Sequence, residues 1–110
     1  MRPLSPVAPR VRQTLNAVAA HFAPRGVRLF VFGSAAAHWP QAPAGADLDL
    51  GYEVAAAGPD QQAALRRELL LALAELPTIR PVDLVDFGIA APEFRQAACA
   101  VTHDLPDVRA

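Results

Sequence analysis

The segment from Ala46 to Val54 alternates between apolar and polar or small side chains at nearly every position. Successive side chains of a β-strand point to opposite faces of its sheet, so this alternation predicts a strand. The apolar face consists of Leu48, Leu50, Tyr52 and Val54. The opposite face consists of Asp47, Asp49, Gly51 and Glu53. The apolar face needs a covering layer, so the chain must pack other elements against one side of a sheet.

Two amphipathic helices and two further strands are predicted around this segment. Apolar residues recur at helical spacing from Pro9 to Ala23 and from Asp60 to Leu76. Val27–Phe32 is short, β-branched and aromatic, which predicts a buried strand. Arg80–Phe87 predicts a third strand, with its proline favouring an edge or a strand start.

The remaining segments predict short or irregular structure. Short helices are expected at 35–39 and 92–100, and a loop at 41–45. Residues 1–9 contain three prolines and predict an irregular lead-in, and residues 101–110 predict a frayed tail. The order helix-strand-helix-strand-helix-strand predicts an α/β fold in which helices cover one face of a small sheet.

Composition narrows the possible functions. A chain of 110 residues predicts a single domain over 1–110. Its net charge of -1 argues against a general electrostatic grip on nucleic acid or on an anionic membrane. All ten basic residues are Arg, so lysine chemistry such as a Schiff base is excluded. The sequence has one Cys, no apolar run long enough to span a bilayer and no signal-peptide core, so we expect a cytoplasmic protein.

Three carboxylates stand out as candidate metal ligands. Asp47 and Asp49 are neighbours on one strand face, about 6 to 7 Å apart at the backbone. Carboxylates that close raise each other's pKa unless a cation lies between them, and hard oxygen ligands suit Mg²⁺. Asp83 lies within an apolar strand, where an unpaired carboxylate is costly and implies a partner or a metal. The simpler interpretation of Asp47 and Asp49 is a solvated strand face, and that of Asp83 is a strand end. Asp86 is an alternative third carboxylate.

Gly33 and Ser34 form a candidate anion site. They follow the predicted strand 27–32 and precede a possible short helix. Backbone N–H groups at such a junction can bind phosphate, and glycine permits close approach. A plain turn is the simpler interpretation of the same pair.

These residues together resemble the minimal nucleotidyltransferases of the DNA polymerase β-like superfamily. The matching segments are Phe32-Gly33-Ser34, then twelve residues, then Asp47-Leu48-Asp49-Leu50, and later Val82-Asp83-Leu84-Val85. The resemblance runs from about Val11 to Phe94. It implies a small mixed sheet packed by helices, and transfer of a nucleoside monophosphate, usually AMP from ATP, to a hydroxyl acceptor.

The resemblance also implies a role for each matching residue. Gly33 and Ser34 would hold the triphosphate, and Asp47 and Asp49 would bind two Mg²⁺ ions. Asp83 would complete the metal site and help to deprotonate the acceptor. Asp83 is preferred to Asp86 because its apolar neighbours match the family pattern.

One departure from the family leaves two functions open. The family commonly carries Arg just after Gly-Ser, whereas here three alanines and His38 follow Ser34. The first hypothesis is an active enzyme whose acceptor is a tyrosine of a HEPN-type toxin, as in toxin–antitoxin pairs. The second is a catalytically weak or silent antitoxin that neutralises its partner by contact. A nucleic-acid acceptor is disfavoured because the Arg residues are scattered and offset by acids.

Two smaller features complete the expectations. Cys99 and His103 lie four residues apart, but two ligands do not make a zinc site, so Cys99 is interpreted as a small buried hydrophobe. Leu70 and Leu71 widen the apolar stripe of the helix predicted at 60–76. The widened stripe predicts either a partner or homo-oligomer surface, or a well-covered core.

Overall fold

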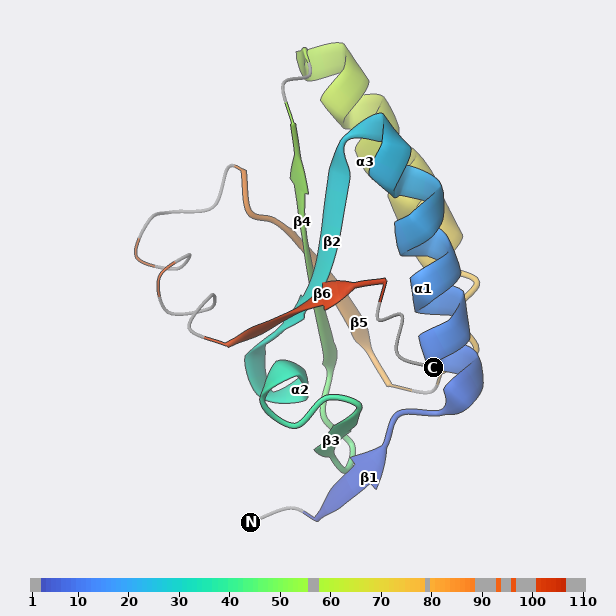
Figure 1. Cartoon of the computed structure of the whole chain (residues 1–110), viewed down its shortest axis with the longest axis vertical. Helices are drawn as coiled ribbons and strands as arrows, with labels where there is room; N and C mark the ends of the chain where they lie inside the picture. The colour runs from blue at the N-terminus through green and yellow to red at the C-terminus, as the bar shows by residue number, and fades with distance from the viewer. Residues whose placement is uncertain are drawn as a thin grey trace.

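The computed structural model describes residues 3–55, 58–78, 80–88, 93, 96 and 101–106 and has a small mixed α+β fold (Figure 1). Its elements in chain order are β1 (Leu4–Pro6), α1 (Pro9–Phe22), the 3-10 turn η1 (Ala23–Arg25), β2 (Val27–Phe32), α2 (Gly33–Ala37), β3 (Gln41–Pro43), β4 (Leu48–Val54), α3 (Pro59–Leu73), β5 (Val82–Asp86) and β6 (Thr102–Leu105). The predicted α/β class is confirmed. No helix within these ranges is long and apolar enough to cross a membrane.

The main sheet has four strands in the order β5-β4-β2-β6. β2 pairs antiparallel with both β4 and β6, whereas β4 pairs parallel with β5. Parallel neighbours need a crossover connection, and α3 supplies it between β4 and β5. The sheet is therefore mixed, and its two central strands are the two that the sequence marks most clearly.

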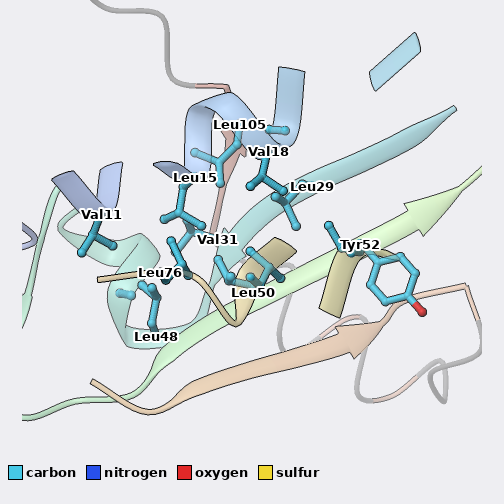
Figure 2. Packing of buried hydrophobic residues seen from close by; sticks show 14 of the residues in the cluster. Val11, Leu15, Val18, Leu29, Val31, Leu48, Leu50, Tyr52, Leu76 and Leu105 are labelled. Atoms are coloured by element: carbon cyan, nitrogen blue, oxygen red, sulfur yellow. The ribbon is translucent and has the colours of Figure 1, made fainter. Parts of the chain in front are cut away.

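Helices α1 and α3 pack against one face of this sheet, as the sequence predicts (Figure 1). Val11, Leu15 and Val18 of α1 lie buried together with Leu29 and Val31 of the sheet (Figure 2). The apolar face of β4 contributes Leu48, Leu50 and Tyr52, each at most 2% exposed. The alternation in β4 thus points its apolar side chains into the core, as expected.

The opposite face of the sheet carries a small aromatic cluster. Phe30 and Phe32 pack edge-on against Phe87, with ring centroids 4.9 and 5.0 Å apart. Gly51 is in register with Phe30, and a Cβ there would lie 2.5 Å from the Phe30 ring and 2.6 Å from the Phe87 ring. The glycine in the polar face of β4 therefore makes room for two aromatic rings.

The predicted irregular lead-in is wrong at 4–6, and the predicted loop is wrong at 41–43. These segments form β1 and β3, which pair antiparallel as a separate two-stranded sheet. Arg80 links this small sheet to the main one, because its guanidinium donates to the Pro43 and Ala46 carbonyls and to the Ser5 hydroxyl. Nothing in the local pattern around either segment signals this long-range contact.

The predicted frayed tail is wrong at 102–105, where β6 forms the edge of the main sheet beside β2. Leu105 is 8% exposed and joins the core. The predicted short helix at 92–100, Cys99 included, lies largely outside the described residues; Glu93 and Gln96, which are described, are helical. The long helix ends at Leu73 rather than Leu76, although hydrogen-bonded turns carry the chain on to Leu76.

Gly51→Ala should destabilise the fold, because the added methyl would overlap both rings of the aromatic cluster. Overpacking of this kind costs about 1 to 3 kcal/mol in the free energy of unfolding. Gly58→Ala is the matched control, since among the described residues no atom outside its chain neighbours and its own helix lies within 4 Å of a Cβ there. The Gly58→Ala variant should lose less than about 1 kcal/mol of unfolding free energy, because Gly58 contributes only a helix N-cap preference of that scale. Urea denaturation measures both, and equal losses would contradict this packing argument.

Candidate functional site

Asp49 and Asp83 lie side by side on neighbouring strands. The parallel register of β4 and β5 pairs Asp49 with Asp83, and neighbouring strands are about 4.8 Å apart. Both side chains alternate with residues that face the helices, so both belong to the opposite face of the sheet. The structure thereby brings together two carboxylates that are far apart in the sequence.

Asp47 adds a third negative charge just before β4. Its side chain is exposed, whereas that of Asp49 is partly buried. The pKa of Asp49 is raised above its usual value, first by burial, then by the charge of Asp83 and then by that of Asp47. The charges of Asp83 and Asp47 therefore both act on Asp49, which is at the centre of the group.

Gly33 lies directly against Asp49. It follows the last residue of β2 and has a φ of 68°, a left-handed conformation that favours glycine. A Cβ at Gly33 would lie 2.6 Å from Oδ2 of Asp49. Ser34 comes next, exposed, in the first turn of α2. Gly33 thus lies beside Asp49, and Ser34 follows it at the start of α2.

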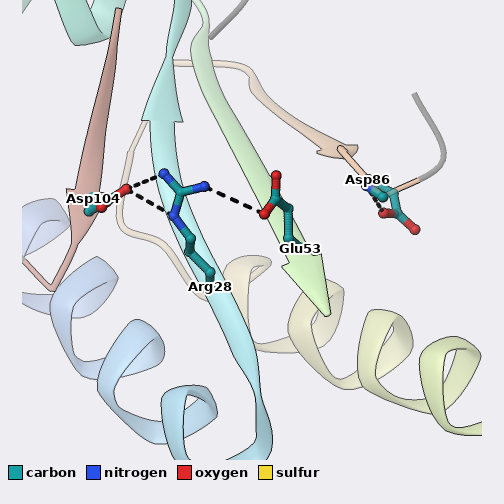
Figure 3. A network of polar contacts seen from close by, with 5 residues as sticks. Arg28, Glu53, Asp86 and Asp104 are labelled. Carbon is teal, nitrogen blue, oxygen red and sulfur yellow. Dashed lines mark hydrogen bonds and ion pairs between the residues drawn. The ribbon is translucent and has the colours of Figure 1, made fainter. Parts of the chain in front are cut away.

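Asp86 is separated from this group. It lies three residues after Asp83 on β5, in register with Tyr52, and so faces the helix side of the sheet. One of its oxygens accepts a hydrogen bond from the Gly88 amide, at the end of β5 (Figure 3). The pKa of Tyr52 is raised, first by burial and further by the charge of Asp86. The register therefore favours Asp83 over Asp86 as the neighbour of Asp49.

Glu53, the remaining acid on the polar face of β4, belongs to a different network. Arg28 donates two hydrogen bonds to Asp104 on β6 and lies 3.5 Å from a Glu53 carboxylate oxygen (Figure 3). Its guanidinium also lies over the Phe30 ring. This network ties β6, β2 and β4 together, so Glu53 has a structural ion-pair partner.

Asp47, Asp49 and Asp83 have no such partner within the described ranges, where none of the three accepts a side-chain hydrogen bond or forms an ion pair. In the same ranges, no three His, Cys, Asp or Glu side chains form a closed metal cage. Mg²⁺ commonly takes only one or two carboxylates and fills its other positions with water and substrate phosphates. The donor set of hard oxygens and the unneutralised charge fit that open kind of site.

The structure also identifies a positioning residue that the sequence does not signal. Arg80 precedes β5 and binds the carbonyl of Ala46, the residue before Asp47. With its bonds to Pro43 and Ser5, it fastens the turn that leads into β4. Its role depends on contacts across more than thirty positions of sequence, so local patterns could not have revealed it.

Trp39 and His38, which directly follow α2, differ in their surroundings. Trp39 packs against the main core, and its ring centroid lies 6.1 Å from that of His103. His38 is exposed at the end of α2, a helix that carries no basic residue. Within the described ranges, the missing Arg after Ser34 is therefore not replaced by another basic residue of α2.

Gly33→Ala should destabilise the protein more than Gly26→Ala does. Both glycines have positive φ, so each substitution pays about 1 to 2 kcal/mol of backbone strain. Only at Gly33 does the new methyl also overlap Asp49, because the nearest atom to a Cβ at Gly26 is 3.6 Å away. The double variant Gly33→Ala/Asp49→Ala should recover the excess loss in a double-mutant cycle of unfolding free energies. Additive losses would show that Asp49 does not contact Gly33.

Asp49→Asn should stabilise the folded protein at neutral pH in magnesium-free buffer. Because the pKa of Asp49 is higher in the folded state, ionisation is penalised there, and stability falls as pH rises from the unfolded-state pKa to the folded-state pKa. The gain in the midpoint of thermal unfolding should therefore shrink as pH falls from the raised pKa of Asp49 toward the usual Asp pKa of about 3.9, and it should be absent below that pH. A destabilised Asn variant at neutral pH would contradict the penalty that burial and the neighbouring carboxylates place on ionised Asp49.

No protein-family model matches this chain, and no curated protein matches it. The features available are two carboxylates in parallel register, a third beside them, and a glycine packed against the central one.

Proposed function

We propose that this chain is a Mg²⁺-dependent nucleotidyltransferase that moves AMP from ATP to a hydroxyl acceptor. One observation carries the proposal: Asp49 lies between Asp83 on the neighbouring strand and Gly33 at the end of β2. Mutually repelling carboxylates beside a glycine turn are suited to a cation that bridges protein and phosphate. Two metal ions held by Asp47, Asp49 and Asp83 would stabilise charge on the attacking and leaving oxygens of a phosphoryl transfer.

The proposed reaction is an in-line displacement at the α-phosphorus of ATP. The acceptor oxygen forms a bond to that phosphorus while the bond from phosphorus to the bridging pyrophosphate oxygen breaks. Pyrophosphate leaves with the electron pair of the broken bond. The acceptor's proton passes to the carboxylate of Asp83 and from there to solvent, for which the exposure of Asp83 is suitable.

The chain's other residues would bind and orient the nucleotide. Gly33 leaves backbone open beside Asp49, where a side chain at that position would obstruct a phosphate. Ser34 offers a hydroxyl donor from an exposed position next to it. Arg80, by holding the turn before Asp47, would keep the first carboxylate near the other two.

We propose a protein hydroxyl as the acceptor, specifically a tyrosine of a HEPN-type toxin, with this chain as the cytoplasmic antitoxin. A nucleic-acid acceptor is disfavoured because several Arg side chains are engaged internally. Arg25 pairs with Glu68, Arg28 pairs with Asp104 and Glu53, and Arg80 binds backbone carbonyls. Such engaged side chains do not form the basic track that RNA binding requires.

A silent antitoxin is the second candidate, and one observation favours it. Helix α2, which begins at the Gly-Ser pair, contains no basic residue to contact a triphosphate. In this alternative the chain keeps the fold and neutralises its partner by contact alone. The two candidates differ in whether carboxylate substitution abolishes a chemical step.

Asp83→Asn should abolish AMP transfer, whereas Asp86→Asn should leave transfer within about two-fold of wild type, well below the hundred-fold scale typical of acid–base residues. The two acids lie on the same strand but on opposite faces, so they form a matched pair. Transfer is measured with α-labelled ATP, Mg²⁺ and the HEPN-type partner. Asp47→Asn and Asp49→Asn should also lose Mg²⁺-dependent ATP binding.

Three results would separate the hypotheses. Label on the partner with wild type and Asp86→Asn only would support the enzyme. Loss of transfer in Asp86→Asn but not in Asp83→Asn would show that the third carboxylate is misassigned. No transfer by wild type, together with a stable complex that the Asp47→Asn/Asp49→Asn variant still forms, would favour the silent antitoxin.

A further inference from the structure

Helix α3 presents exposed apolar side chains beside the stripe that it buries against the sheet. Its leucines divide cleanly: Leu65, Leu69 and Leu73 are buried, whereas Leu70 is 43% and Leu71 66% exposed. We define the leucine face as the exposed residues Ala63, Ala64, Leu70, Leu71 and Ala74. Beside it lies a hollow of about 200 Å³ between α3 and β5, lined by Leu70, Leu73, Ala74, Val82 and Leu84.

Two opposite charges flank this face symmetrically. Arg67 precedes Leu71 by four positions, one turn of α3, and Glu75 follows Leu71 by four positions, in the hydrogen-bonded turn just beyond the end of α3 at Leu73. Hydrogen-bonded turns carry the chain beyond Leu73, with the Glu75 amide donating to the Ala72 carbonyl. Within the described ranges neither Arg67 nor Glu75 forms an ion pair, in contrast to Glu68, which pairs with Arg25.

Glu75 places a negative charge just beyond the C-terminal end of α3, where negative charge is unfavourable. The C-terminal end of a helix carries partial negative charge and favours a cation, yet the last turn of α3 has no basic residue. The positions four residues before and after Arg67 are Ala63 and Leu71, so the helix offers Arg67 no acidic partner at that spacing. A cation brought from outside would relieve the negative charge at the end of α3.

We propose that the leucine face binds the same face of a second copy of this chain, with the two α3 helices antiparallel about a two-fold axis at Leu71. Such an arrangement places Arg67 of each copy opposite Glu75 of the other, because each charge lies four positions from Leu71. A two-fold interface uses the same patch on both copies, and this patch is complementary to itself in charge. The exposed leucines meet at its centre, where they lose contact with water.

This dimer leaves the carboxylate group accessible. α3 covers the helix side of the sheet, whereas Asp49 and Asp83 lie on the other side. Each copy would therefore present its candidate site away from the interface. The proposal is independent of nucleotidyl transfer and can be tested without ATP or a partner protein.

Sedimentation analysis of the purified chain across a concentration series tests the proposal. Wild type should populate a dimer. Arg67→Glu or Glu75→Arg should each raise the dissociation constant of this dimer by about ten-fold. The double reversal Arg67→Glu/Glu75→Arg should restore dimerisation, because it exchanges the two charges. Leu71→Glu should give a monomer, whereas Arg10→Glu, an exposed charge reversal on α1, should have no effect.

Thermal unfolding should show that all of these variants remain folded, since the substituted side chains are exposed. A wild-type chain that stays monomeric at every concentration would overturn the proposal. So would a dimer that tolerates Leu71→Glu, or single charge reversals that the double reversal fails to rescue. A monomer that binds a different protein through Leu71 would likewise overturn it, by assigning the face to another occupant.

Discussion

Strand β4 determines the arrangement of the whole molecule, because it pairs antiparallel with β2 on one edge and parallel with β5 on the other. The parallel pairing requires a crossover, and α3 provides it while covering the apolar face of the sheet. The antiparallel pairing aligns Gly51 with Phe30 and makes room for the aromatic cluster. A shift of one residue in either register would exchange the two faces of β4 and expose its leucines.

The candidate site is a direct consequence of these two pairings. One register puts Asp83 beside Asp49, and the end of β2 puts Gly33 against the same carboxylate. Burial, and then the charges of Asp83 and Asp47, make ionised Asp49 costly without a counterion, as its raised pKa indicates. The acid further along β4 avoids that cost, because Arg28 neutralises Glu53 within a network that also anchors β6. The same strand thus carries one structural acid and one acid suited to binding a cation.

Contacts distant in sequence hold the periphery in place. β1 and β3 pair only because the chain returns past β1 after α2, and Arg80 fastens the pair to the turn before β4. The same turn leads to Asp47, so the small sheet and the carboxylates share one support. The leucine face of α3, by contrast, is exposed. Because the charges on either side of Leu71 are complementary to themselves, we propose that a second copy of the chain covers this face.

Periodicity in the sequence by itself determined the two long helices, the central strands and the division of β4 into an apolar and a polar face. These features depend on which side chains can share one surface, and spacing along the chain is enough to decide that. The sequence also singled out the carboxylates and the Gly-Ser pair, of which the structure brings Asp83 and Gly33 against Asp49, but it left Asp83 and Asp86 as alternatives. Only the tertiary structure could separate them, because the choice depends on the register between β4 and β5. Strands β1, β3 and β6 were missed for the same reason. Each is stabilised by pairing with a segment distant in sequence, and no local sequence pattern indicates that pairing.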